Sequence, residues 1–118
     1  MLRLMTEKDE LNVVSDQIGS PTNAKGLAQF LWQLAEQESL EPIYHYSDLG
    51  VASWYDFAIA IQEIAYATGK LTTEIPIKPI PSSKYPTPAK RPSFSLLTPC
   101  AHAVHWRERL KNNLREFK

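Results

Sequence analysis

Proline is concentrated in one part of this sequence. Seven of the nine prolines lie between positions 70 and 99 of the 118-residue chain. Proline lacks the backbone N–H that a helix needs, and it holds the residue before it in extended geometry. We therefore expect no regular helix here. We predict a proline-rich strap over residues 75–99 that begins as an edge strand and lies over a surface.

The residues before the strap alternate between strand and helix patterns. Residues 11–14 form a run rich in β-branched side chains, and residues 43–46 alternate as a strand does. Between them, a helix is predicted from Thr22, which offers a capping hydroxyl, to Glu38. Its apolar side chains recur every three or four residues, so we expect this stripe to be buried on the strands. The stripe consists of Ala24, Leu27, Ala28, Leu31, Leu34 and Ala35.

A second helix is predicted between residues 53 and 69. Ser53 and Asp56 have the spacing of a capping box, and Gly69 is the residue expected to end the helix. The aromatic side chains of its first turn are interpreted as core residues rather than as a platform for a ligand. They are Trp54, Tyr55 and Phe57.

A terminal helix is predicted over residues 105–117, and residues 1–10 resemble the end of another helix. The terminal helix carries Arg and Lys on one side and an apolar stripe on the other, so we expect it to dock on the rest of the chain. The stripe consists of Trp106, Leu110, Leu114 and Phe117. Short strands that alternate with helices indicate an α/β fold, and a chain of this length forms one domain at most.

Cysteine content and hydrophobicity indicate the compartment. The single cysteine, Cys100, excludes an internal disulfide and favours a reducing environment. The first residues lack the pattern of a secretory signal, and no stretch is long and apolar enough to span a bilayer. These features predict a soluble, cytoplasmic protein without a membrane partner.

Charge is unevenly distributed along a chain whose formal net charge is zero. Residues 1–77 hold 4 basic and 11 acidic side chains, whereas residues 78–118 hold 9 basic and 2 acidic ones. The basic end predicts a locally positive site for an anionic ligand. It lacks the aromatic-studded basic motif of a nucleic-acid binder, so no nucleic-acid partner is expected.

Residues 16–22 connect the first predicted strand to the helix after it. Gly19 permits a backbone angle that other residues avoid, and Pro21 stiffens the exit. In α/β folds, ligands usually bind in loops that leave the carboxyl ends of strands. The local pattern leaves two interpretations open, a ligand-binding loop and a capped connection without a ligand.

Four ordered blocks of sequence carry a family resemblance. They are residues 1–4 with 13–22, residues 43–46 (Ile-Tyr-His-Tyr), residues 53–58 (Ser-Trp-Tyr-Asp-Phe-Ala) and residues 85–92 (Tyr-Pro-Thr-Pro-Ala-Lys-Arg-Pro). Together they resemble the carboxyl-terminal part of bacterial dTDP-4-dehydrorhamnose reductases, in the extended short-chain dehydrogenase/reductase superfamily. The resemblance covers residues 1–97. It weakens where the connection before Trp106 is shorter than in the family.

The resemblance implies that residues 1–118 are a single carboxyl-terminal substrate-binding domain, a fragment of a larger reductase that lacks the Rossmann domain. Met1 is then expected at an internal position of the parent protein. The full-length family reduces dTDP-4-dehydro-L-rhamnose to dTDP-L-rhamnose with NADPH or NADH, for surface polysaccharides such as the lipopolysaccharide O-antigen. The expected partners are a dTDP-sugar ligand, a missing or separate cofactor domain and a second copy in a homo-oligomer.

The resemblance also implies four substrate-binding residues. Asp16, Gln17 and Gly19 lie in the strand-to-helix loop, and Arg91 lies in the last block. Gln17 is suited to bond a sugar or a base, and the flat guanidinium of Arg91 is suited to form paired bonds to a diphosphate. A solvated or salt-bridged Arg91 is the alternative.

No catalytic or cofactor-binding residue is predicted in the chain. The four glycines are scattered and build no glycine-rich loop for a pyrophosphate. Tyr66 and Lys70 match the Tyr-x-x-x-Lys spacing of the family's catalytic pair. Gly69 is expected to break the helix between them, so we predict no catalytic role for the pair.

No metal site is predicted either. Cys100, His102 and His105 offer zinc-ligand chemistry, but their spacing matches no common site. His45 is interpreted as a core or rim histidine.

Because the chain lacks the cofactor loop and the catalytic pair, it is predicted to be inactive alone. The alternative function is a non-catalytic, reductase-like interaction or regulatory module, because the surface on which a cofactor domain docks would present an apolar patch to partners.

Overall fold

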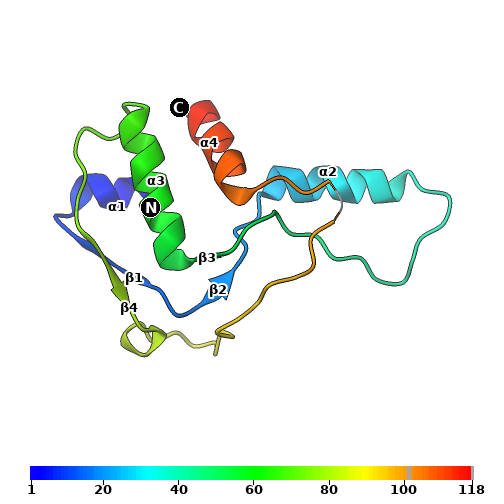
Figure 1. Ribbon diagram of the computed structural model, residues 1–118, viewed down its shortest axis with the longest axis horizontal. Coiled ribbons are helices and arrows are strands. Elements are labelled where there is room, and N and C mark those ends of the chain that lie inside the picture. Colours follow the sequence, from blue (N-terminus) through cyan, green and yellow to red (C-terminus); the bar gives the residue numbers. More distant parts are fainter. Residues whose placement is uncertain (101, 118) are drawn as a thin grey trace.

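Helix α3 contacts most other elements of the fold and lies among them (Figure 1). The computed structural model describes residues 1–100 and 102–117. In chain order the elements are α1 (Leu2–Glu7), β1 (Leu11–Val14), β2 (Ile18–Gly19), α2 (Ala24–Ala35), β3 (Ala52–Ser53), α3 (Trp54–Ala67), β4 (Ile77–Ile80), the 3₁₀ turn η1 (Ser82–Lys84) and α4 (Trp106–Glu116).

Two small sheets join segments that are far apart in the chain. β1 pairs in parallel with β4, with Leu11 opposite Ile77. β2 pairs antiparallel with β3, with Ile18 opposite Ser53. Because β1 and β4 are parallel, their carboxyl ends lie on the same side. The architecture is a small α/β domain, as the sequence predicts.

The core is built around α3, which is buried on more than one side. Ala58, Ala60 and Ala65 are fully buried, and their small side chains allow neighbouring elements to approach closely. The buried apolar residues are Met5, Leu11, Ala52, Ala58, Ala60, Ile61, Ala65, Leu71, Ile77, Trp106, Leu110 and Leu114. They range from Met5 to Leu114, so the core joins segments from both ends of the sequence.

Helix α4 packs on α3 as a docking helix. Trp106, Leu110 and Leu114 recur every four residues and are all buried. The ring of Trp106 lies 5.8 Å from that of Phe57 in an edge-on arrangement. Phe117 differs from the prediction, because it follows the last residue of the helix and is 63% exposed. The helix is therefore docked despite the shorter connection that precedes it.

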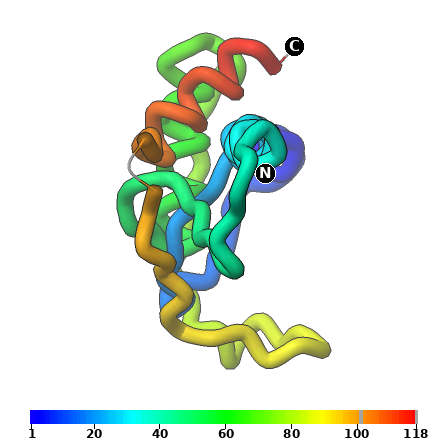
Figure 2. The backbone as a smooth tube through the Cα atoms, turned by 90° about the vertical axis from the view of Figure 1, so that its right-hand side faces the viewer, coloured from blue at the N-terminus to red at the C-terminus, as the bar shows by residue number. Residues whose placement is uncertain are grey.

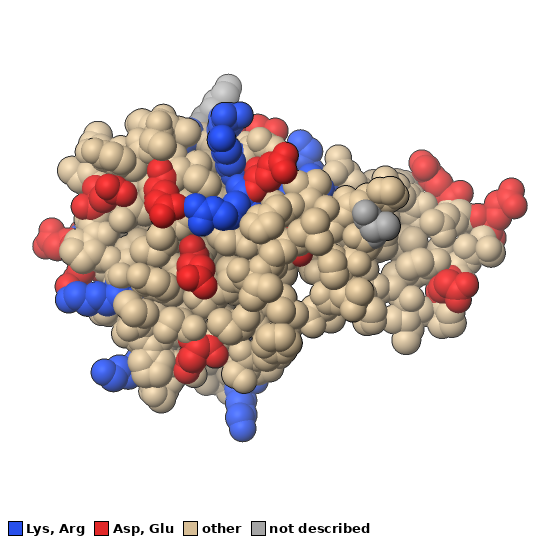
Figure 3. Space-filling model, in the orientation of Figure 1, with Lys and Arg blue, Asp and Glu red and all other residues tan. Residues whose placement is uncertain are grey.

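Helix α2 projects from the core with its apolar stripe largely exposed (Figure 1). Leu27 is 38% exposed and Leu31 is 56% exposed; within α2, which is described in full, only Gly26 is buried. The predicted burial of this stripe is wrong, because β1 and β4 lie against α3 and leave no sheet beneath α2. We call residues 24–46 the α2 lobe. Acidic side chains gather at its outer end (Figure 3).

The first turn of α2 is capped by Asn23 rather than by Thr22. Oδ1 of Asn23 accepts a hydrogen bond from the backbone N–H of Gly26 at 2.8 Å. The hydroxyl of Thr22 donates to the carbonyl oxygen of Ser20 instead. The helix ends at Ala35, short of the predicted end. Both residue types at the start are good caps, and only the backbone geometry decides between them.

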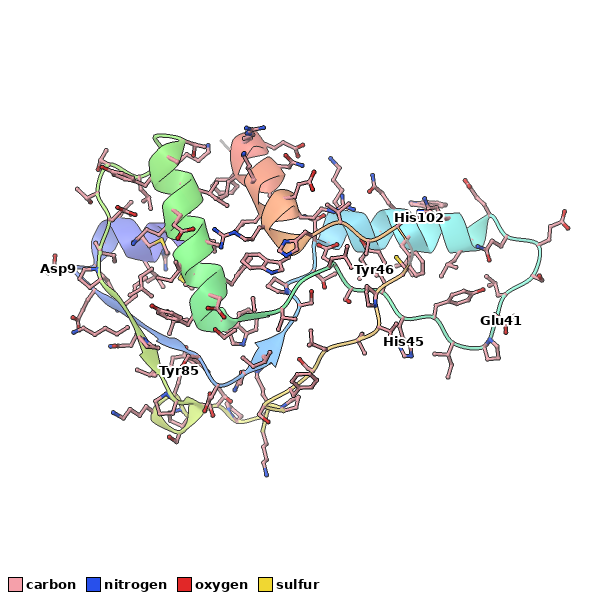
Figure 4. All side chains as sticks on the ribbon, viewed as in Figure 1. Asp9, Glu41, His45, Tyr46, Tyr85 and His102 are labelled. Carbon is pink, nitrogen blue, oxygen red and sulfur yellow. The ribbon has the colours of Figure 1, made fainter. Side chains whose placement is uncertain are left out.

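Residues 43–46 form no strand, so that prediction is wrong. The rings of Tyr44 and Tyr46 lie 6.3 and 5.0 Å from the Phe30 ring of α2. His45, between them, is exposed rather than in the core (Figure 4). A strand requires a backbone partner, and no strand in the described part of the chain lies beside this segment.

The proline-rich segment forms no α-helix, as predicted, over residues 70–99, all of which are described. β4 and η1 take up its first part. The segment then returns to β2, where Ile18 bridges to Phe94. Figure 2 shows the yellow part of this strap at one end of the molecule.

Candidate functional site

The loops that leave the carboxyl ends of β1 and β4 are joined by hydrogen bonds. The carboxylate of Asp16 accepts the backbone N–H of Ser82 at 2.9 Å and its hydroxyl at 3.0 Å. Asp16 therefore holds the turn after β4 beside the loop after β1. It lines neither of the two hollows at this end of the strands. Its contact with a substrate stays a prediction.

Two hollows adjoin Gln17 in the loop after β1, and the larger one runs back along β1 to its amino end. The smaller, of about 160 Å³, lies between the 16–22 loop, β3 and the strap. The larger, of about 950 Å³, follows α1, β1 and the segment after β4. The two share Gln17, Trp54 and Arg91. Sites for drug-sized ligands usually measure roughly 300–1,000 Å³, so of the two only the larger has room for such a ligand.

Three of the four predicted substrate-binding residues line these hollows. Gln17 and Arg91 line both, and Gly19 lines the smaller one. Arg91 is exposed, and it forms no ion pair with any other described residue. Lys84 lines the larger hollow as well. The guanidinium is thus free of carboxylate partners and can receive an anion.

Gly19 is required for close approach rather than for an unusual backbone angle. Positive φ angles occur at Gly50 and Gly69 but not at Gly19, so the predicted reason is wrong. A Cβ at Gly19 would lie 2.9 Å from Oγ of Ser95. The backbone N–H of Ser95 donates to the carbonyl of Ile18 at 2.9 Å. Gly19 therefore allows the strap to close over β2 at the edge of the smaller hollow.

Trp54 lies at the hollows rather than in the core. Its side chain is 52% exposed, and its Nε1 donates a hydrogen bond to Oε1 of Gln17 at 3.2 Å. The core interpretation is wrong for Trp54, whereas Tyr55 and Phe57 are half-buried against the core. Helical periodicity identifies the face on which Trp54 lies. It does not show that the helix begins at the edge of the core.

A buried carboxylate supports the 16–22 loop, and the sequence analysis misses it. Asp48 is 1% exposed, and its Oδ2 accepts the backbone N–H of Asn23 at 2.9 Å. Its backbone carbonyl accepts the hydroxyl of Ser20 at 2.5 Å. Asp48 therefore fixes the end of the loop that lines the smaller hollow. The sequence shows only a turn at this point, and no local signal marks the carboxylate as buried.

The hydroxyl of Tyr46 also faces this carboxylate. It donates to Oδ1 of Asp48 at 3.3 Å. Burial and, second, the negative charge of Asp48 raise the pKa of Tyr46 above its ordinary value of 10.0, while Arg109 acts in the opposite direction. The phenol therefore stays protonated at neutral pH and remains a hydrogen-bond donor.

Tyr66 and Lys70 do not lie on consecutive turns of one helix. Helix α3 ends at Ala67, and Gly69 has a φ of +72°. The ammonium of Lys70 donates to the backbone carbonyl of Phe117. These features agree with the expectation that Gly69 breaks the helix. The four glycines lie far apart in the sequence, so the chain does not fit the glycine-rich loop that binds a dinucleotide.

The metal-type ligands near the end of the chain are not gathered into a site. Among the described residues, no three His, Cys, Asp or Glu side chains are grouped to hold a metal ion. Nδ1 of His105 accepts the backbone N–H of Arg107 at 3.2 Å and so caps α4, and His102 is exposed (Figure 4). None of the helices in the described ranges has the length and apolar composition to cross a membrane.

Comparison with models of protein families shows which family the chain belongs to. The family model described as RmlD substrate binding domain matches residues 1–118. The chain belongs to this family. The match continues past residue 97, where the resemblance seen in the residues weakens, and it therefore includes α4 of this RmlD substrate-binding domain.

Similar proteins support the same family. The spore coat polysaccharide biosynthesis protein SpsK of Bacillus subtilis (strain 168) is 39% identical over 122 residues, which cover 98% of this chain and 40% of SpsK. The dTDP-4-dehydrorhamnose reductase of Aggregatibacter actinomycetemcomitans is 44% identical over 102 residues, 82% of this chain and 35% of the reductase. The predicted resemblance is confirmed. The chain spans less than half the length of these relatives.

Two solved structures share the fold of this RmlD-family domain. The dTDP-4-dehydrorhamnose reductase of Clostridium acetobutylicum matches with a TM-score of 0.86 and 30% identity, over 98% of this chain and 41% of that one. The reductase of Bacillus anthracis, solved in complex with NADP, matches with a TM-score of 0.81 and 28% identity, over 98% and 41%. The predicted fold class is confirmed.

Proposed function

We propose that the chain is the substrate-binding part of a dTDP-4-dehydrorhamnose reductase. The parent reaction is the reduction of dTDP-4-dehydro-L-rhamnose to dTDP-L-rhamnose with NADPH or NADH, in surface polysaccharide biosynthesis. The family match supports this proposal. So do the names of the relatives, which include a polysaccharide biosynthesis protein and a reductase solved with NADP.

The observation that carries the proposal is the meeting of Gln17 and Arg91 at both hollows. These residues are far apart in the sequence, and each was expected to contact the substrate. A diphosphate bound by Arg91 leaves its sugar and its base to extend into the hollows on either side. Gly19 keeps the strap close to the loop, and Asp16 holds Ser82, so both support this arrangement.

We further propose that the chain alone is inactive. Reduction needs a bound nicotinamide, and the scattered glycines do not fit its pyrophosphate. Tyr66 and Lys70 are separated by the end of α3 and do not form the family's catalytic pair. Cofactor binding therefore falls to a separate part. The proposal of inactivity is refuted by rapid NADPH oxidation when the chain is mixed with dTDP-4-dehydro-L-rhamnose.

Calorimetric titration with dTDP-L-rhamnose tests substrate binding. We expect saturable binding by the chain and an increase in Kd of about tenfold or more in Arg91→Ala, because a guanidinium forms paired bonds to a diphosphate. Arg115→Ala is the matched control, since Arg115 is exposed on α4 and lines neither hollow. No binding by the unaltered chain, or equal Kd changes in the two variants, contradicts the proposal.

One observation favours a second candidate function, that of an interaction module without catalysis. The α2 lobe exposes Leu31, Trp32 and Ile43 at 56%, 71% and 73%. Apolar side chains gathered in this way are typical of a protein-binding surface. This lobe is also where we expect a cofactor domain or a second copy of the chain to dock.

A further inference from the structure

The pairing of β2 with β3 places Trp54 beside Gln17. Ile18 lies opposite Ser53 in this antiparallel ladder. The residue before Ile18 and the residue after Ser53 are therefore the next pair along the two chains. The capping box of α3 holds this point: the Ser53 hydroxyl accepts the N–H of Asp56 at 3.1 Å, and the Asp56 carboxylate accepts the N–H of Ser53 at 2.8 Å. Trp54 is thus presented at the rim by rigid backbone.

The indole determines which end of the Gln17 amide remains for a ligand. An indole N–H can only donate, so it selects the amide oxygen as its acceptor. The hydrogen bond from Trp54 Nε1 to Gln17 Oε1 at 3.2 Å has this polarity. The amide NH₂ has no partner among the described residues. A ligand at the shared wall of the two hollows therefore meets Gln17 as a hydrogen-bond donor.

We propose that Trp54 is a positioning residue that makes Gln17 a donor to a ligand oxygen, with its exposed indole face forming an apolar wall of the site. The inference rests on the proposed function for the nature of the ligand. It assigns the atom that the Gln17 NH₂ recognises to one class, a carbonyl or hydroxyl oxygen of the base or sugar. Both halves of a nucleotide sugar offer such oxygens.

A double-mutant cycle in the full 118-residue chain tests this role. We expect Trp54→Phe, which keeps an aromatic ring but removes the N–H, to increase the Kd for dTDP-L-rhamnose about three- to tenfold. In a Gln17→Ala background the same change should have almost no effect, because the amide that Trp54 orients is absent. Trp32→Phe, on the exposed α2 lobe, is the matched control and should leave the Kd unchanged.

The Gln17→Glu variant tests the polarity. A carboxylate still accepts from the indole but cannot donate, so we expect a larger loss of affinity than in Asn12→Asp, which adds the same charge to the larger hollow. The NMR signal of the Trp54 indole N–H in the free chain gives a readout that needs no ligand, and it should shift in Gln17→Ala.

The outcomes separate this inference from the proposed function. If the unaltered chain and Trp54→Phe bind dTDP-L-rhamnose with equal Kd, the inference about Trp54 is overturned and the proposed function is not. The same follows if Trp54→Phe weakens binding equally with and without Gln17, or if the indole signal does not respond to Gln17→Ala. Failure of the unaltered chain to bind dTDP-L-rhamnose overturns the proposed function and, with it, the ligand assignment made here.

Discussion

The carboxylate of Asp48 and the guanidinium of Arg109 form an ion pair that joins the residues behind the 16–22 loop to the last helix. Oδ1 of Asp48 lies 3.8 Å from Nε of Arg109; the Asp48 side chain is fully buried and that of Arg109 is 26% exposed. This distance exceeds a hydrogen bond, and Nε of Arg109 has no hydrogen-bond partner within the described ranges. The contact is therefore an attraction of charges, and the hydrogen bonds of Asp48 come from other groups.

Asp48→Asn tests how much this buried charge contributes to the free energy of unfolding. The variant keeps the shape of the side chain but leaves the Arg109 guanidinium without its counter-charge, so we expect the free energy of unfolding to fall by about 3 kcal/mol. Urea denaturation measures the change. The control is Glu63→Gln, which removes an exposed ion pair with Arg107 at 2.5 Å and should cost about 0–1 kcal/mol. Equal losses in the two variants would contradict a structural role for the Asp48 charge.

Tyr46 predicts a pH dependence of stability on the alkaline side. Its pKa is raised in the folded chain, so the folded state keeps the phenol proton at pH values where the unfolded state loses it. The stabilising contribution is complete below pH 10.0 and is lost as the pH rises through the raised pKa. We expect Tyr46→Phe to remove this part of the alkaline decline, measured by thermal unfolding from pH 8 to 11. Parallel declines in the two proteins would show that Tyr46 contributes nothing to it.

Substitutions at Gly50 and Gly69 distinguish the cost of backbone strain from the cost of crowding a new Cβ against neighbouring atoms. Their φ angles are +93° and +72°. A Cβ at Gly50 would also lie 2.8 Å from Cδ1 of Trp106, whereas no atom lies within 4 Å of one at Gly69. We expect Gly69→Ala to cost about 1 kcal/mol from strain alone and Gly50→Ala to cost about 3 kcal/mol, because it also displaces the start of α4. Urea denaturation that ranks the two variants in the reverse order refutes this account.

The α2 lobe predicts self-association of the chain. Exposed apolar side chains on α2 favour burial against a second copy, and Leu31→Glu should increase the dimer dissociation constant about tenfold by placing a charge in that contact. Sedimentation equilibrium measures the constant. Phe117→Glu changes an exposed apolar side chain outside the lobe, 63% exposed against 56% for Leu31, and should have no effect. A strict monomer at millimolar concentration rules out the second copy as occupant of the lobe.

Ser53 and Asp56 illustrate what can be predicted from sequence. Both bonds of their predicted capping box are present, and the helix they begin ends before Gly69 as expected. These features depend on residues that are neighbours in the chain. The resemblance suggests Gln17 and Arg91, which line both hollows, and their contact with a substrate stays a prediction. The apolar pattern assigns Trp54 to the core, because such a pattern cannot show where along a helix the core ends.

By itself, the sequence determined the α/β class, the absence of α-helix from the proline-rich segment and the types of side chain on which the proposed substrate site depends. Local backbone preferences and side-chain chemistry are sufficient for these. The tertiary structure alone decided that the regular apolar stripe of α2 is exposed, that residues 43–46 have no strand partner and that Asp48 is buried behind the 16–22 loop. Burial and strand pairing are contacts between distant parts of the chain, and a pattern among neighbouring residues does not specify which distant part they meet.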